Sequence, residues 1–159
     1  PTPALLTRTC LNAAKIPHFV INAGSKVSPD IESFDAILPN GKNISESSAM
    51  TVEDVHNAVD FGKVVGNALS VSTNCLVIGE SIPGGTTTAL AVLKGFGLDA
   101  SVSSSMPNNP IELKNKVAST AANRIKSDDP FEIIAELGDP MIPVCAGMLY
   151  EASKHSHVL

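Results

Sequence analysis

Short apolar runs alternate along this chain with stripes of apolar residues at helical spacing. The runs are His18–Asn22, Cys75–Gly79 and Ala100–Val102, and each is followed by small or polar residues. Such runs are typical of buried strands that end in loops. Strands that alternate with helices predict an α/β fold, here a three-layer α/β/α sandwich with a mainly parallel, Rossmann-like sheet.

Most of the predicted helices begin with a capping signal. Thr51 and Asp54 resemble a capping box, and the apolar stripe behind them predicts a helix over about residues 51–70. A short helix is also expected at about residues 4–14. Three further starts combine an Asn or Asp cap with a proline in the first helical position: Asn109-Pro110, Asp129-Pro130 and Asp139-Pro140. The cap oxygen can accept an orphan N–H, and proline fits a position that needs no donor.

Residues 25–50 are rich in Ser, Pro, Asn and Gly and predict a long loop over the surface. Such a long loop is unusual in a compact domain. It either lines a site or wraps a neighbouring subunit, and a simple surface excursion is an equally good interpretation.

Composition narrows the class of protein. The chain has 159 residues, of which 43% are hydrophobic, which is enough for the core of one domain. Its net charge of -5 and its scattered basic residues argue against nucleic acid or an anionic membrane as a partner. No apolar run is long enough for a membrane span and the first residues have no signal-peptide layout, so a soluble, cytoplasmic protein is expected.

The cysteines and histidines give no sign of a disulfide framework or a metal site. Cys10, Cys75 and Cys145 are far apart and lie among apolar or small neighbours, which predicts free, buried thiols. His155 and His157 have no second pair of ligands at helical spacing. No metal and no other cofactor is therefore expected.

The most informative segment, GESIPGGTTTA, covers Gly79–Ala89 and lies between an apolar run and a predicted helix. Glycines let the backbone approach a ligand closely, and the free N–H groups and positive dipole end of a helix favour an anion there. We call Glu80–Thr88 the cradle and expect it to hold a phosphate. Its donors would be the amides and hydroxyls of Gly84, Gly85, Thr86, Thr87 and Thr88. The alternative is a turn that merely joins a strand to a helix.

The spacing within the cradle also indicates which phosphate it would hold. Gly79, Gly84 and Thr86 fit the nucleoside-triphosphate pattern G-x-x-x-x-G-K-[ST], but Gly85 stands where that pattern has its lysine. Backbone amides, hydroxyls and Glu80 suit one phosphate and the hydroxyls of a sugar better than ATP with magnesium. A phosphosugar or mononucleotide is the predicted ligand, and a degenerate nucleotide hydrolase is a weaker alternative.

Ligands of open parallel sheets bind beyond the carboxyl ends of the strands, so three loops should converge there. They are Asn22-Ala23-Gly24, the cradle and Ser103-Ser104-Ser105. Lys114, one turn into the next helix, could bring a cation to the phosphate, although a serine turn and a solvated lysine are the plainer interpretations. Glu80 could bind ribose hydroxyls or counter a positive charge on the sugar, or it could simply bond loop amides.

Two segments, Cys75–Ala122 and Gly138–Gly147, resemble the nicotinate-nucleotide:dimethylbenzimidazole phosphoribosyltransferase family in its archaeal and cyanobacterial branch. The matching motifs are the long cradle motif, the serine triplet, and Asn-Pro with a downstream lysine. Pro3-Ala4-Leu5 and Asn22-Ala23-Gly24 are similar too. The resemblance covers nearly the whole chain, and its first motif is specific.

This resemblance implies transfer of a phosphoribosyl group from nicotinate mononucleotide to a benzimidazole-type base, a step in assembling the lower ligand of cobamides. It places Glu80 by the ribose, Ser81 at the base, and the cradle glycines and threonines with Lys114 at the phosphate. It also suggests a homodimer. The acceptor base stays open.

The family's general base is a glutamate beyond the last residue of this chain, so no catalytic residue is assigned within residues 1–159. The resemblance therefore implies a single α/β domain from the central portion of a chain about twice as long, inactive by itself. A noncatalytic sugar-phosphate or mononucleotide-binding module is the alternative function.

Overall fold

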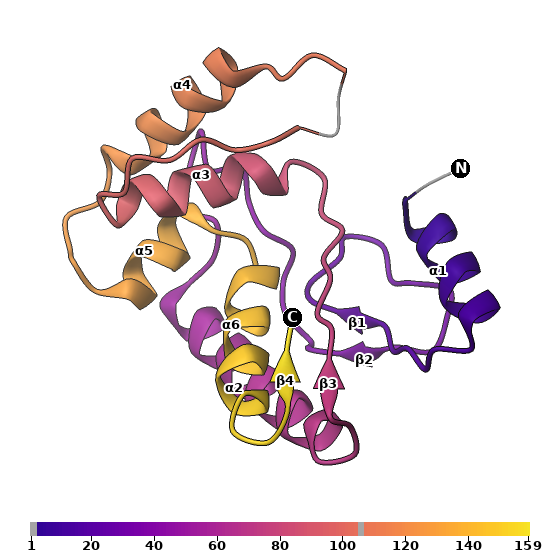
Figure 1. Cartoon of the computed structure of the whole chain (residues 1–159). Coiled ribbons are helices and arrows are strands. Elements are labelled where there is room, and N and C mark those ends of the chain that lie inside the picture. Colours follow the sequence, from indigo (N-terminus) through magenta and orange to yellow (C-terminus); the bar gives the residue numbers. More distant parts are fainter. Residues whose placement is uncertain (1–2, 105–106) are drawn as a thin grey trace.

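The computed structural model describes residues 3–104 and 107–159, which form six helices and four short strands (Figure 1). In chain order these are α1 (Pro3–Ala14), β1 (Ile21–Asn22), β2 (Phe34–Asp35), α2 (Val52–Ser70), β3 (Cys75–Leu76), α3 (Gly85–Gly95), α4 (Ile111–Ala122), α5 (Pro130–Leu137), α6 (Met141–Ala152) and β4 (His157–Val158). None of the helices in the described ranges is long and apolar enough to cross a membrane.

The strands are parallel, as predicted, and they form two separate ladders. β1 pairs with β2, and β3 pairs with β4. The second ladder continues past its assigned strands, because the amide of Ile78 donates to the carbonyl oxygen of Leu159 at 2.8 Å. Helices α3 to α6 form the crossover between β3 and β4. The α/β class is confirmed, with a sheet that is divided into two-stranded pieces in this part of the chain.

The predicted loop over residues 25–50 is structured at two places. Its middle forms β2, and its second half belongs to the core, where three apolar side chains are buried: Ile44, Ala49 and Met50. Arg124 fixes this half by donating to the carbonyl oxygen of Ile44 at 2.7 Å and to the carboxylate of Glu136. Burial alone would raise the pKa of Glu136. Hydrogen bonds from Ser48 and Arg124 and the charge of Arg124 together outweigh that effect, so the pKa lies below its ordinary value.

The predicted strand at Ala100–Val102 is wrong, and one of the predicted helix caps is wrong for the same reason. Asn109 does not cap α4 with its side chain; its Nδ2 donates to the carbonyl oxygen of Val102 at 2.9 Å. Lys114 of α4 donates to the next carbonyl oxygen, that of Ser103, at 2.7 Å. Polar side chains at the start of α4 therefore hold this segment as extended coil, and they use acceptors that a sheet partner would need.

The other predicted capping side chains are confirmed, although Pro140 precedes α6 instead of occupying its first position. Thr51 and Asp54 form a complete capping box at the start of α2. The side chain of Asp129 accepts from the amide of Phe131 at 2.9 Å, and that of Asp139 accepts from the amide of Met141 at 3.0 Å.

Helices α2 and α6 pack so closely that glycine is required at their contact. A Cβ on Gly62 would lie 2.2 Å from the carbonyl oxygen of Val144, and a Cβ on Gly147 would lie 2.2 Å from that of Val59. Both distances are far inside van der Waals contact, so no larger residue fits without moving a helix backbone. This contact fixes α6, and with it Asp139 just before its first residue.

The cysteine prediction is half right. All three thiols are free, but Cys10 and Cys75 are exposed and only Cys145, on α6, is partly buried. Cys10 lies on α1 at the edge of the molecule (Figure 1), and Cys75 lies in a two-stranded ladder that does not cover it. Apolar neighbours in sequence therefore do not imply burial at these two positions.

Candidate functional site

Helix α3 begins with an open N-terminus. The residue before it, Gly84, has φ +77°, and no side chain caps the helix. A left-handed backbone disfavours other residues, although a Cβ at Gly84 would meet nothing within 4 Å. The sequence predicted both the glycine turn and the helix start here. The positive dipole end of this 11-residue helix therefore receives no hydrogen bond from a capping side chain.

Some of the predicted cradle donors are already used by the protein. The carbonyl oxygens of Ile82 and Gly84 accept three backbone amides, those of Gly85, Thr87 and Thr88. Across the described residues, the N–H groups of Gly84 and Thr86 have no hydrogen-bond acceptor, and neither do the hydroxyls of Thr86 and Thr87. The donors that remain are therefore two amides and two hydroxyls.

Thr88 connects the beginning of α3 to the beginning of α6. Its hydroxyl donates to Oδ2 of Asp139 at 2.7 Å and also lies 3.0 Å from the carbonyl oxygen of Gly85. Asp139 is only 8% exposed, and burial raises the pKa of its carboxyl despite the hydrogen bonds from Thr88 and the first α6 amides. The sequence predicted Asp139 as a helix cap and missed this second bond, because it joins the start of α3 to a residue 51 positions further along the chain.

Glu80 lies over the same helix start. Its side chain is exposed, and Oε2 is 3.7 Å from the position of a Cβ on Gly85. Burial raises the pKa of the Cys145 thiol, and the charges of Asp139 and Glu80 raise it further. Both carboxylates are therefore near enough to Cys145 to act on its thiol, and the Thr88 hydroxyl is bonded to the buried one, that of Asp139. Ser81, the next residue, is exposed.

Lys114 is not a solvated lysine. It is 6% exposed, and its Nζ donates to the carbonyl oxygen of Ser103 at 2.7 Å. An ammonium has three donors, so this bond leaves capacity for an anion. The chain between α3 and α4 turns back toward the beginning of α3 (Figure 1), and α4 packs on α3. The structure thus brings Lys114 and the serine loop together as predicted; Ser104 is half-buried, and Ser105 lies outside the described residues.

The loop after β1 also reaches this region, but the side chain of its Asn22 is already hydrogen-bonded within the protein. Asn22 is buried, and its amide group bonds the carboxylate of Asp35 at 3.0 Å and the backbone N–H of Ser25 at 2.9 Å. Gly24 has φ +85°, and a Cβ there would lie 3.3 Å from the Cβ of Pro140. Gly24 therefore lies so close to the Pro140 side chain that a larger residue would contact it.

The segment around Gly41 packs at the same place, which agrees with one of the alternatives for the 25–50 loop, that it lines a site. A Cβ on Gly41 would lie 3.1 Å from the Cδ of Pro140, and the carbonyl oxygen of Pro39 lies 2.7 Å from the Cβ position of Gly24. Part of the long 25–50 segment therefore lines the region beside Asp139. The proline and glycine signals predicted turns here, but turns alone do not say what they pack against.

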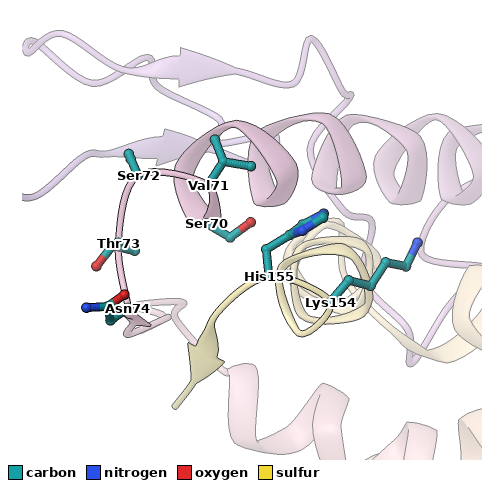
Figure 2. Close-up of a pocket in the computed structure, with 7 residues that line it drawn as sticks. All are labelled: Ser70, Val71, Ser72, Thr73, Asn74, Lys154 and His155. Carbon is teal, nitrogen blue, oxygen red and sulfur yellow. The ribbon is translucent and has the colours of Figure 1, made fainter.

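A polar hollow of about 620 Å³ lies away from the cradle, beside the beginnings of β3 and β4 (Figure 2). Its lining residues are Ser70, Val71, Ser72, Thr73, Asn74, Lys154 and His155. The cradle follows the carboxyl end of β3, so this hollow and the cradle lie at opposite ends of that strand. The Lys154 ammonium in the hollow already forms an ion pair with Glu151 at 2.7 Å. In the two described ranges, no group of three or more His, Cys, Asp or Glu side chains could hold a metal ion.

Residues 9–159 match a family model described as phosphoribosyltransferase. The UPF0284 protein of Archaeoglobus fulgidus is 50% identical over 154 residues, which cover 97% of this chain and 46% of that protein. The UPF0284 protein of Methanosarcina mazei is 41% identical over 155 residues, which cover 94% of this chain and 44% of that protein. The chain therefore spans about half the length of the curated relatives it matches.

Two solved structures from Thermus thermophilus have a similar fold. A crystal structure of CobT has a TM-score of 0.78 and 22% identity, covering 94% of this chain and 48% of that one. A structure described as nicotinate-nucleotide-dimethylbenzimidazole phosphoribosyltransferase has a TM-score of 0.77 and 23% identity, covering 94% and 47%. This likeness establishes the fold. Because the family model covers nearly the whole sequence, the chain belongs to the phosphoribosyltransferase family that its motifs indicated.

Proposed function

We propose that the protein carrying this chain transfers a phosphoribosyl group from nicotinate mononucleotide to a benzimidazole-type base. The observation that carries this proposal is the open start of α3, where the Gly84 and Thr86 amides have no acceptor among residues 3–104 and 107–159 and the exposed carboxylate of Glu80 is near. A helix start with free amides suits a single phosphate, and the turn has no lysine for a triphosphate. Membership of a phosphoribosyltransferase family supports the same ligand class.

The proposed binding mode assigns the remaining donors. The amides of Gly84 and Thr86 and the hydroxyls of Thr86 and Thr87 hold the phosphate. Lys114 supplies a positive charge from beneath the serine loop. Asn22 and Gly24 shape the loop beside Pro140, because the Asn22 side chain is already hydrogen-bonded and Gly24 lies against Pro140.

In the proposed reaction, the bond from ribose C1′ to the nicotinate nitrogen breaks and a bond from C1′ to a nitrogen of the incoming base forms. The ribose carbon becomes cationic as nicotinate leaves, so the Glu80 carboxylate stabilises that charge more than it opposes the phosphate. Ser81 borders the base. The base nitrogen loses its proton to a general base, which we place outside these 159 residues, so that this chain supplies binding and charge stabilisation. A homodimer of the longer protein is part of the proposal.

The test is an assay of the intact protein with nicotinate mononucleotide and 5,6-dimethylbenzimidazole, read as release of free nicotinate and formation of the new nucleotide. Both products are expected, and neither should need magnesium or ATP. Tight binding of nicotinate mononucleotide without nicotinate release would favour a noncatalytic binding module. Magnesium-dependent ATP binding in the cradle would contradict the ligand assignment.

A further inference from the structure

The bond between Thr88 and Asp139 joins two helix starts that are 51 residues apart in the sequence. On one side, Asp139 is held firmly: it is buried, it accepts the first amide of α6, and α6 is locked against α2 by Gly62 and Gly147. On the other side, the start of α3 carries no side-chain cap and follows an exposed turn. The bond therefore connects the start of α3, which is less constrained, to Asp139, which is held in place by its surroundings.

The hydroxyl of Thr88 is fully occupied in this arrangement. It has one proton, and two acceptors lie within reach, Oδ2 of Asp139 at 2.7 Å and the carbonyl oxygen of Gly85 at 3.0 Å. Its own amide donates to Gly84. A phosphate would have to displace one of these bonds to use Thr88, whereas Thr86 and Thr87 offer free hydroxyls.

We propose that Asp139 is a positioning residue for the anion site, which it serves by holding Thr88 and so fixing the direction of the free Gly84 and Thr86 amides. This inference rests on the proposed function. Thr88 is then a link between helices rather than a phosphate donor. The direction in which the affinity for phosphate changes when Asp139 is replaced distinguishes two roles. If Asp139 acted only through its negative charge near the anion site, its removal would tighten phosphate binding. As a positioning residue, its removal weakens binding.

Single and double variants of the intact protein test this by calorimetry with nicotinate mononucleotide. Asp139→Ala and Thr88→Val each remove the bond, and each is expected to raise Kd about tenfold, with the double variant no worse than either single one. Thr88→Val leaves the α6 cap intact, so it separates the bond from the loss of that cap. Asp139→Asn and Thr88→Ser are the conservative controls: an asparagine can still accept from Met141 and donate to the threonine oxygen, so Kd should stay within about threefold.

Three results would overturn the proposal. Tighter binding by Asp139→Ala would make Asp139 a nearby charge and nothing else. Weaker binding in Thr88→Val with unchanged binding in Asp139→Ala would make Thr88 a direct ligand. Additive losses in the double variant would show that the two side chains act separately.

Amide hydrogen exchange without ligand separates this proposal from the proposed function. Peptides covering residues 84–90 should exchange faster in Asp139→Ala and Thr88→Val than in the wild type, while α2 peptides stay unchanged as a control for folding. If the wild type binds no nicotinate mononucleotide, the proposed function fails and exchange alone decides the positioning role. Unchanged exchange at residues 84–90 in both variants would rule that role out.

Discussion

Gly84 and Thr87 show how far single residues can be read from the sequence. The double glycine and threonine triplet predicted a helix start with free donors, and the structure has one, with Gly84 at φ +77°. The sequence could not show which of these amides are already hydrogen-bonded, because they reach the carbonyl oxygens of Ile82 and Gly84 only in the folded turn. It also missed the second bond of Asp139, since that bond needs a partner from a distant helix.

Thr87→Val should weaken binding of nicotinate mononucleotide by about 1 to 3 kcal/mol, because a charged ligand loses a hydroxyl donor. The stability of the protein should hardly change, since the Thr87 hydroxyl has no partner in the described part of the protein. Calorimetry and denaturant unfolding measure the two effects. Thr87→Ser is the matched control and should bind like the wild type. Equal affinity of Thr87→Val and wild type would remove this hydroxyl from the site.

The ion pair of Arg124 and Glu136 predicts a pH dependence of stability. The pKa of Glu136 in the folded protein lies below its ordinary value of 4.5, so the ionised carboxylate stabilises the fold above pH 4.5. That stabilisation is lost as the pH falls from 4.5 through the lowered folded pKa. Glu136→Gln should therefore reduce the free energy of unfolding by about 1 to 2 kcal/mol at pH 7, because a partly buried charged hydrogen bond is weakened.

The quantity to follow is the difference in the free energy of unfolding between wild type and Glu136→Gln, measured by urea unfolding from pH 7 to pH 3. Asp139 titrates in the opposite direction, because its raised pKa favours the protonated folded form, and the subtraction removes its contribution. Asp60→Asn is the control: it breaks the exposed pair with Lys63 and should cost less than about 0.5 kcal/mol. A difference that stays constant down to pH 3 would refute this assignment.

At the scale of elements, helices were predicted better than strands for a physical reason. A helix forms its backbone hydrogen bonds within one segment of the chain. Its first residue is also marked by neighbouring residues in the sequence, such as the capping box of Thr51 and Asp54. A strand needs a partner, and the partner of β1 is β2, which lies inside the segment that was predicted as a loop. The false strand at residues 100–102 had the right apolar residues, but side chains from the start of α4 bond the backbone there instead.

Gly147→Ala should destabilise the protein by about 1 to 3 kcal/mol or more, because its methyl would meet the carbonyl oxygen of Val59 and force α2 and α6 apart. Denaturant unfolding measures this. Gly79→Ala is the matched control: nothing lies within 4 Å of the Cβ position there, so the change should stay within about 0.5 kcal/mol. Equal stability of Gly147→Ala and wild type would mean that the two helices tolerate separation.

At the scale of the whole molecule, two hydrophobic clusters share helix α2. One contains Val55 with side chains of α3, α4 and α5, and the other contains Val65 with Val144 and Met148 of α6. The proposed anion site lies beside the bond from Thr88 of α3, which belongs to the first cluster, to Asp139 near the start of α6, which belongs to the second. The sequence predicted enough apolar residues for a core and the α/β class, but the division into two clusters follows from packing that no local pattern encodes.

Nicotinate mononucleotide should therefore stabilise the whole chain against unfolding. At a free ligand concentration about 100 times Kd, the free energy of unfolding should rise by about 2.7 kcal/mol, seen as a higher Tm in a thermal scan. Gly84→Val is the control, because valine disfavours the left-handed backbone of that residue and should abolish most of the shift. A Tm that does not respond to ligand in the wild type would contradict binding to the folded protein.

The most direct test of the central claim is a crystal structure of the protein with nicotinate mononucleotide. We expect phosphate oxygens within hydrogen-bond distance of the Gly84 and Thr86 amides, with Glu80 beside the ribose. This expectation would be contradicted by a nucleotide bound elsewhere, with those two amides bonded to groups of the protein itself.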